Sequence, residues 1–166
     1  MEAGPSLWFA KDPAFDRRFR DRFLALHEAA ARGSLEDWSA TPAGALALCL
    51  LLDQFPRNAF RGTARMYLTD ERARFVAEAA IRAGHDRAVG ELALFFYLPF
   101  GHSEIVAHQE RSVELARRLG PEQLQHALGH RDIVRRFGRF PHRNAILGRN
   151  TLPEEQRFLD EGGFSG

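Results

Sequence analysis

Apolar residues recur at helical spacing along most of the chain. The segment from residue 13 to residue 33 has one apolar face, formed by Phe15, Phe19, Phe23, Leu26 and Ala30. The segment 45–55 is apolar nearly all round, which is typical of a central buried helix. No segment shows the sustained alternation of a half-buried strand. The pattern therefore predicts an all-α protein.

Capping and helix-breaking residues set the expected helix bounds. Asp12 followed by Pro13, and Thr41 followed by Pro42, are start signals, and Pro56 is expected to end the second helix. Thr69 and Ser103 are expected to cap their helices, and Thr151 with Glu154 to form a capping box. The sequence predicts about seven helices, at residues 13–33, 42–55, 69–83, 91–98, 103–119, 121–137 and 151–162.

Length and composition favour one α-helical domain over residues 1–166. The chain is 45% apolar and long enough to bury a sizeable core. Its single cysteine, Cys49, excludes an internal disulfide and is expected to pack as an apolar group. No apolar run is long enough to cross a bilayer, and the first residues lack the pattern of a secretory leader. We expect a cytoplasmic protein without membrane contact.

The charge balance gives little reason to expect nucleic-acid binding. Twenty-three basic and 22 acidic residues leave a net charge of +1, so no bulk attraction to polyanions follows. Between Arg111 and Arg149, nine arginines against three acidic residues give a local excess of six positive charges. Because Asp53, Glu104 and Glu110 are expected near the same site, we predict no nucleic-acid partner.

Two similar stretches follow expected helix ends and carry the most distinctive chemistry. Residues 55–59 read FPRNA and residues 140–145 read FPHRNA, and each proline disfavours a helical conformation in the residue before it. We therefore expect the polar side chains beyond each proline on loops, where guanidinium and amide groups commonly hold a carboxylate or phosphate. The candidate ligand-binding residues are Arg57, Asn58, Arg61, Arg143, Asn144 and Arg149. The alternative is that these arginines cap helix carbonyls and the asparagines form local turns.

A third stretch, GHSEIVAHQE at residues 101–110, adds acid–base groups. The candidate catalytic residues are Asp53, His102, Glu104 and His142, whose types suit proton transfer. The spacing His102-x-Glu104-x-x-x-His108 matches no strong zinc pattern, and an ion pair of Glu104 with His108 explains those two residues more simply. Ser103 lacks the second glycine of a nucleophile elbow. We predict no metal site and no cofactor.

These motifs together resemble a known bacterial family. LLDQFPRNAFRGT, FFYLPFGHSE with HQERSVEL, and RFGRFPHRNAILGR followed by EEQRFL are similar to the domain of unknown function 924, over nearly the whole chain. The resemblance implies a tetratricopeptide-like bundle of antiparallel helix pairs, although no 34-residue repeat consensus is visible. The family has no established reaction.

The resemblance also marks signature positions. These are Asp53, Gln54, Pro56, Arg57, Asn58, His102, Ser103, Glu104, Gln109, Glu110, Arg139, Pro141, His142, Arg143 and Asn144. Similar proteins usually carry an apolar, aromatic-rich segment ahead of the part that matches residues 7–15, whereas only six residues precede Leu7 here. The resemblance implies either a late start of this sequence or a truncated first element.

Two classes of function remain open from the sequence. One is a site for a small anionic molecule, with arginines holding the anion and a carboxylate or histidine moving a proton. The other is a helical scaffold that binds an acidic peptide or protein without chemistry. The oligomeric state cannot be predicted. If the first class is right, the three polar stretches should meet in space.

Overall fold

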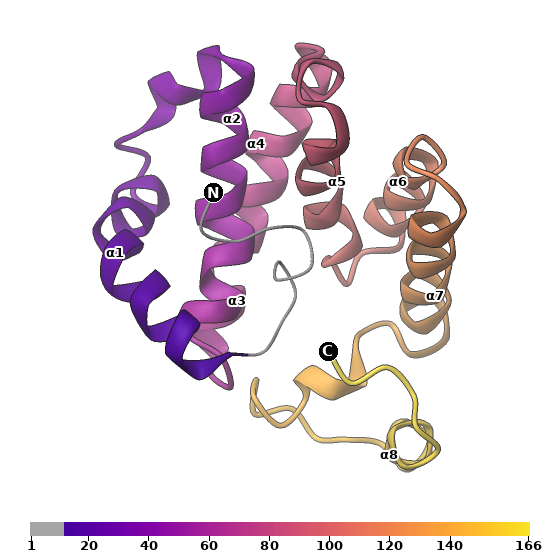
Figure 1. The fold of residues 1–166 in the computed structure, drawn as a ribbon. Helices are drawn as coiled ribbons and strands as arrows, with labels where there is room; N and C mark the ends of the chain where they lie inside the picture. The colour runs from indigo at the N-terminus through magenta and orange to yellow at the C-terminus, as the bar shows by residue number, and fades with distance from the viewer. Residues whose placement is uncertain (1–11) are drawn as a thin grey trace.

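The computed structural model describes residues 12–166, and the elements in that part of the chain are all helical (Figure 1). The α-helices are α1 Pro13–Ala31, α2 Pro42–Cys49, α3 Phe55–Ala59, α4 Asp70–Arg82, α5 Leu94–Gly101, α6 Val106–Ala116, α7 Pro121–Phe137 and α8 Pro153–Asp160. A π-helical turn, Leu50–Gln54, joins α2 to α3 without a break. With α2 and α3 counted as one helix, residues 12–166 contain seven α-helices, as the sequence predicted.

Successive helices pack as neighbours and enclose two main cores. Helices α2, α4 and α5 lie side by side, and α6 and α7 continue the array (Figure 1). The larger core joins α2, α4 and α5 through residues that include Cys49, Ala77 and Phe96, all fully buried. The smaller core joins α1, the α2–α3 helix and α4 through Leu52 and Ala73. Alanines on α4 allow the close approach of these helices.

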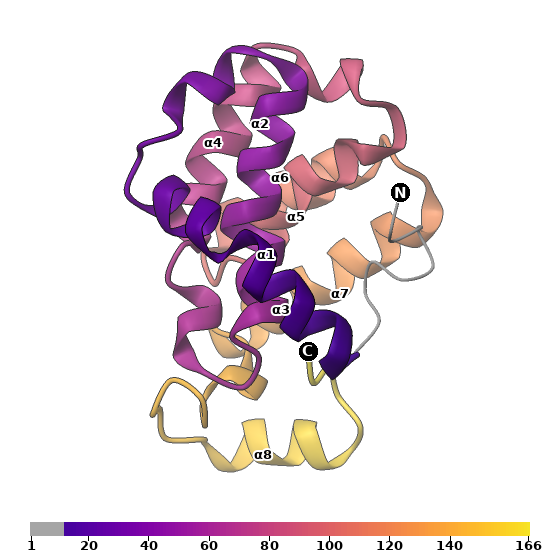
Figure 2. The same ribbon diagram turned by 60° about the vertical axis from the view of Figure 1, so that its left-hand side comes forward.

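The segment between α7 and α8 brings the chain back to the end of the molecule at which α3 lies (Figures 1 and 2). Figures 1 and 2 both place this segment beside the α3 end of the helix array, with α8 beyond it. Arg143 from this segment donates a hydrogen bond to the carbonyl of His102, which directly follows α5. Residues about 40 positions apart are thereby brought together, which positions the candidate site.

Several helix ends agree with the sequence signals. Asp12 caps α1, since its Oδ1 accepts from the backbone N–H groups of Ala14 and Phe15 at 2.8 and 3.1 Å. Thr41 caps α2 by accepting from the N–H of Gly44 at 3.2 Å. Helix α7 has the predicted bounds and ends at Gly138, whose φ of 70° is in the left-handed region that glycine adopts readily.

The prediction that Pro56 ends the second helix was wrong. Phe55 keeps helical angles, φ −54° and ψ −48°, and Pro56 lies in the first turn of α3. The π-helical turn explains how the chain continues. The N–H of Phe55 donates to Leu50, so the carbonyl of Leu51 instead accepts from Nδ1 of His27 at 2.9 Å.

Pro56 also leaves a second carbonyl, that of Leu52, without its usual hydrogen-bond donor. Because Pro56 has no N–H, Leu52 loses its α-helical donor, and the Thr69 hydroxyl donates to that carbonyl at 2.5 Å. Side chains from α1 and from the start of α4 therefore hold the helix through its proline. As a result Arg57 and Asn58 lie on a helix, whereas the sequence had predicted that they lie on a loop. Pro141 behaves as expected, since Phe140 before it is extended.

Four smaller expectations about helix ends also need correction. Pro99 lies inside α5 and does not follow it. Helix α6 is shorter than expected, and Ile105, not Ser103, is its N-cap residue. Thr69 occupies the N-cap position of α4, but its side chain bonds to Leu52 and not to α4. At α8, Glu155 takes the role expected of Glu154, since its carboxylate accepts from the N–H of Leu152 at 2.7 Å.

Four further expectations remain. Cys49 is buried, as expected. Within residues 12–166, no helix combines the length and the apolar character needed to cross a bilayer. The expectation of a late start or a truncated first element concerns residues outside the described part of the chain. The tetratricopeptide-like arrangement stays an expectation from the resemblance.

The role of Thr69 in the proline-containing helix can be tested. Thr69→Val removes the donor to the Leu52 carbonyl, and an unsatisfied buried carbonyl costs about 1–3 kcal/mol. We expect the free energy of unfolding, measured by urea denaturation, to fall by about that amount. Thr63→Val is the matched control because Thr63 makes a similar bond at an exposed site, to the carbonyl of Phe60. Equal losses in the two variants would contradict this interpretation of the helix.

Candidate functional site

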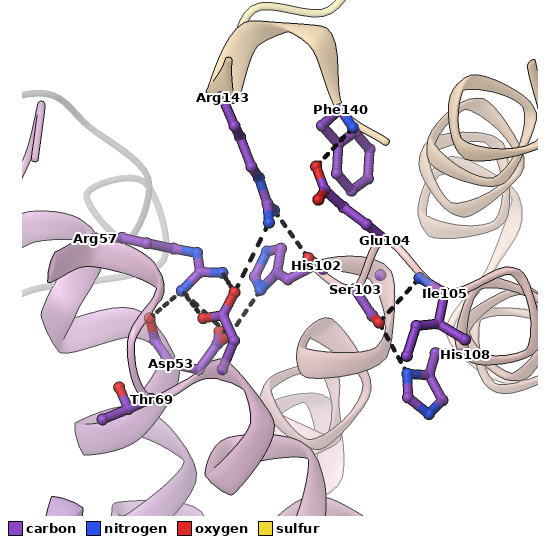
Figure 3. A network of polar contacts seen from close by, with 12 residues as sticks. Asp53, Arg57, Thr69, His102, Ser103, Glu104, Ile105, His108, Phe140 and Arg143 are labelled. Atoms are coloured by element: carbon purple, nitrogen blue, oxygen red, sulfur yellow. Dashed lines mark hydrogen bonds and ion pairs between the residues drawn. The ribbon is translucent and has the colours of Figure 1, made fainter. Parts of the chain in front are cut away.

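The three polar stretches meet around the side chains of Asp53 and His102 (Figure 3). Oδ1 of Asp53 lies 2.7 Å from Nδ1 of His102, and Oδ2 accepts from Nε2 of Gln54 at 2.6 Å. Asp53 belongs to the π-helical turn, and only 1% of its side-chain surface is exposed. His102 directly follows α5. Two residues from different predicted motifs thus form a buried carboxylate–imidazole pair.

The surroundings of this pair set its charges. Burial alone would raise the pKa of Asp53, but Arg57 and His102 outweigh it and hold that pKa well below its ordinary value. Burial and the nearby Arg57 charge lower the pKa of His102, against the opposing effect of Asp53. At neutral pH the pair is therefore an ionised carboxylate and a neutral imidazole. Nδ1 carries the proton donated to Asp53, which leaves the lone pair on Nε2.

Arg57 fixes Asp53 to a second carboxylate, that of Asp70. Its Nη1 donates to the Asp53 carbonyl at 2.7 Å and lies 3.4 Å from the Asp53 carboxylate. The same guanidinium donates two parallel bonds to Asp70, at 3.0 and 3.2 Å. Asp70 is the first residue of α4 and was not among the predicted site residues, because an acidic residue in the first turn of a helix is common.

Arg143 approaches the same centre from the segment between α7 and α8. Its Nη2 donates to the carbonyl of His102 at 2.9 Å, and its Nη1 lies 3.9 Å from Oδ2 of Asp70. The guanidinium lies over the rings of Tyr67 and Phe140, 4.5 and 4.7 Å from their centres. Nε of Arg143 is buried and has no hydrogen-bond partner among the described residues. Sequence reasoning also missed Tyr67, which no motif distinguished.

Two of the predicted ligand-binding residues lie elsewhere, between α3 and α1. Nδ2 of Asn58 and Nε of Arg61 donate to the two carboxylate oxygens of Asp16, at 3.0 and 3.1 Å. Their donors serve to join two helices in this structure. A role for them in binding a ligand is a prediction that the contacts do not support.

Two others hold the segment between α7 and α8 in place. Arg149 makes two bonds to the carboxylate of Glu104, at 2.6 and 3.0 Å, and Glu104 also accepts from the N–H of Phe140 at 2.8 Å. Nδ2 of Asn144 donates to Glu155 of α8 at 3.0 Å. The expected ion pair of Glu104 with His108 is absent from the contacts of the described chain, since Nδ1 of His108 pairs with the Ser103 hydroxyl at 2.8 Å.

His142, the fourth predicted catalytic residue, packs in an aromatic cluster. Its ring lies 5.6 Å from that of Phe140 and 5.1 Å from that of Phe164, and Nδ1 is buried without a partner in the described residues. Burial and the charge of Arg143 lower the pKa of His142 to about 4. No contact within residues 12–166 joins His142 to the Asp53–His102 pair. In the same part of the chain, no three His, Cys, Asp or Glu side chains are grouped as a metal ion would require.

The chain is an all-helical protein in which a buried ionic network joins distant helix ends. The sequence model for the bacterial proteins of unknown function named DUF924 matches residues 1–163, and the chain belongs to this family. It is similar to a solved structure, a protein of unknown function, ATU0120, from Agrobacterium tumefaciens. The two are 59% identical with a TM-score of 0.94, and the match covers 97% of this chain and 92% of that chain. A search of curated proteins gave no match.

The half-buried histidines near Phe140, His130 and His142, predict a specific acid sensitivity. Burial lowers the pKa of both His130 and His142 to about 4, from about 6.5 in an unfolded chain. Below about pH 6.5 the unfolded chain therefore takes up protons that the folded protein does not, and the free energy of unfolding should fall steadily towards pH 4. Urea denaturation across this range would measure the slope.

Substitution of either histidine should flatten that slope. His130→Gln and His142→Gln each remove one site of differential proton uptake, whereas His126→Gln, at an exposed position, serves as the control. A wild-type protein whose stability is constant between pH 6.5 and pH 4 would disprove the expected linkage.

Proposed function

We propose that this protein binds a small molecule carrying a carboxylate or phosphate group, and that His102 acts on it as a general base. The observation that carries the proposal is the Asp53–His102 hydrogen bond of 2.7 Å, which occupies Nδ1 of a neutral imidazole and leaves the lone pair on Nε2. Arg143, which bonds to the carbonyl of the same histidine, has a donor without an acceptor among the described residues. A histidine oriented by a buried carboxylate is a recurring arrangement for proton transfer.

Arg143 is the residue best suited to hold the anion. Within the described residues its guanidinium makes one close hydrogen bond, to His102, and its contact with Asp70 is long at 3.9 Å. Nε has no acceptor there, and a buried donor left in that state costs about 1–3 kcal/mol. An anion would supply acceptors for these donors in a forked geometry. The rings of Tyr67 and Phe140 fix the plane of the guanidinium.

Arg57 has a different role in this proposal. Its two terminal nitrogens already donate, Nη1 to the Asp53 carbonyl and to Asp70, and Nη2 to the other oxygen of Asp70. It therefore maintains the ionised state of Asp53 and does not contact the ligand. This refines the sequence prediction, in which Arg57 and Arg143 were equivalent.

The chemistry expected of His102 follows from its two nitrogens. Nδ1 donates to Asp53, so Nε2 would take a proton from the ligand or from a water molecule that attacks it. The resulting imidazolium would be stabilised by the Asp53 carboxylate, whose low pKa keeps it ionised throughout. Glu104 takes no part, since Arg149 and the N–H of Phe140 occupy its carboxylate.

Ligand stabilisation tests the proposal directly. We expect at least one compound in a panel of small carboxylates and phosphates to raise the melting temperature, since a ligand at a hundred times its Kd adds roughly 2.7 kcal/mol. Arg143→Met should abolish this stabilisation because it removes the forked donor. Arg61→Met, which removes an exposed arginine paired with Asp16, is the matched control and should respond like wild type.

His102→Gln separates binding from chemistry. The glutamine amide can still donate to Asp53 but provides no base, so the variant should keep ligand stabilisation and lose any turnover of the same compound. The scaffold alternative, with an acidic peptide bound by Arg143, predicts no turnover in either protein.

Leu48→Ala supplies a reference for purely structural damage. Leu48 is 3% exposed in the core between α1, α2 and α4, and its truncation should cost roughly 2–5 kcal/mol. If Arg143→Met and His102→Gln destabilise the protein as much as Leu48→Ala, and no compound stabilises wild type, the network has only a structural role.

A further inference from the structure

A hollow in the surface lies at the opposite end of α5 from His102. It has a volume of about 440 Å³ and is lined by residues that include Asp86, Arg87, Gly90, Ala93, Tyr97 and Arg118. Gly90 and Ala93 precede α5, and His102 follows its last residue, so the length of the helix, about 12 Å, separates the two places. We propose that this hollow binds a free α-amino acid, with Asp86 facing the amino group and the two arginines, Arg87 and Arg118, facing the carboxylate.

Asp86 supplies the first reason. It is 4% exposed, and its Oδ2 accepts from the Tyr97 hydroxyl at 2.8 Å and from Nη1 of Arg118 at 3.3 Å. Its Oδ1 has no hydrogen-bond partner among the described residues. A carboxylate oxygen can accept two bonds, and a buried one without a donor is unfavourable. Asp86 lines the hollow, so an ammonium group bound there would supply a donor to this carboxylate.

The two arginines supply the second reason. The Arg118 side chain is 46% exposed, and its contacts with Asp86 and with the Tyr97 hydroxyl leave further donors available. Arg87 is exposed and has no ion pair among the contacts of residues 12–166. With one aspartate and two arginines, the lining carries a net positive charge. A ligand that offered only an amine would leave this charge uncompensated, whereas a carboxylate offers acceptors to the guanidinium groups.

The hollow leaves room for the rest of the ligand. Its volume is in the lower part of the range for small-molecule sites, about 300–1,000 Å³. Glycine and alanine, at positions 90 and 93, present little side chain to it. L-Alanine, with its small side chain, is therefore a suitable test ligand. This inference concerns different residues from those of the proposed function and does not depend on it.

Nuclear magnetic resonance of the full chain would test the site. L-Alanine is compared with ethylamine and with propionate, which lack its carboxylate and its amino group respectively. We expect saturable shifts of the backbone amides of Gly90 and Ala93 with L-alanine, and affinities at least about tenfold weaker for each of the two fragments. Equal responses to the three compounds, or no saturation at millimolar L-alanine, would overturn the proposal. Shifts centred on Asp53 and His102 would overturn it as well.

Arginine variants locate the contact. Arg118→Gln and Arg87→Gln should each weaken L-alanine binding by about tenfold or more, whereas Arg117→Gln should leave it unchanged. Arg117 is the matched control because it is exposed, adjacent to Arg118 and not part of the lining. Because Arg118 is 46% exposed and Arg87 is also exposed, their variants should fold normally. Equal effects of Arg117→Gln and Arg118→Gln would refute the assignment.

Discussion

Burial of the Asp53 carboxylate is the constraint on which the centre of this molecule depends. A charge with 1% of its side chain exposed is tolerated only when cations and hydrogen-bond donors surround it. Its own helix supplies Arg57 and Gln54, and His102 supplies the third contact. Arg57 then requires Asp70, and the His102 carbonyl accepts from Arg143. One carboxylate thus links the α2–α3 helix to α4, to the end of α5 and to the segment after α7.

Local signals allowed much of the fold to be predicted. Caps such as Asp12 and Thr41 act through neighbouring backbone groups, so sequence alone identified them, and α7 has the predicted bounds. Pro56 was misread because its effect depends on distant side chains. The donors that keep its helix intact, His27 and Thr69, are 24 and 17 residues from the carbonyls they satisfy, and no local pattern reveals them.

The candidate site was predictable as a set of segments but not as a set of roles. The repeated FP-R-N motif correctly marked regions that meet in space. The sequence could not predict which guanidinium pairs with which carboxylate, because the partners of Arg61 and Arg149 are each 45 residues away. Arg61 and Arg149 therefore belong to ionic links between elements. Nε lacks a partner among the described residues in both Arg143 and Arg149, but the ion-pair contact of Arg143, with Asp70, is long at 3.9 Å. Whether an arginine joins two elements or is available to a ligand depends on which of its donors already have acceptors in the fold. The sequence does not show this.

The spacing of the Asp53 partners along the chain also orders events during synthesis. His102 follows Asp53 by 49 residues, and Arg143 follows His102 by 41. At about 5–20 residues per second, His102 is added about 2–10 s after Asp53. Once Arg82 has been added, the nascent chain holds the complete sequence of α1, α2, α3 and α4, while the imidazole donor to Asp53 does not exist until His102 follows. Ribosome-bound chains of this protein therefore pass through a stage in which apolar helices are complete and their buried charge is not fully compensated.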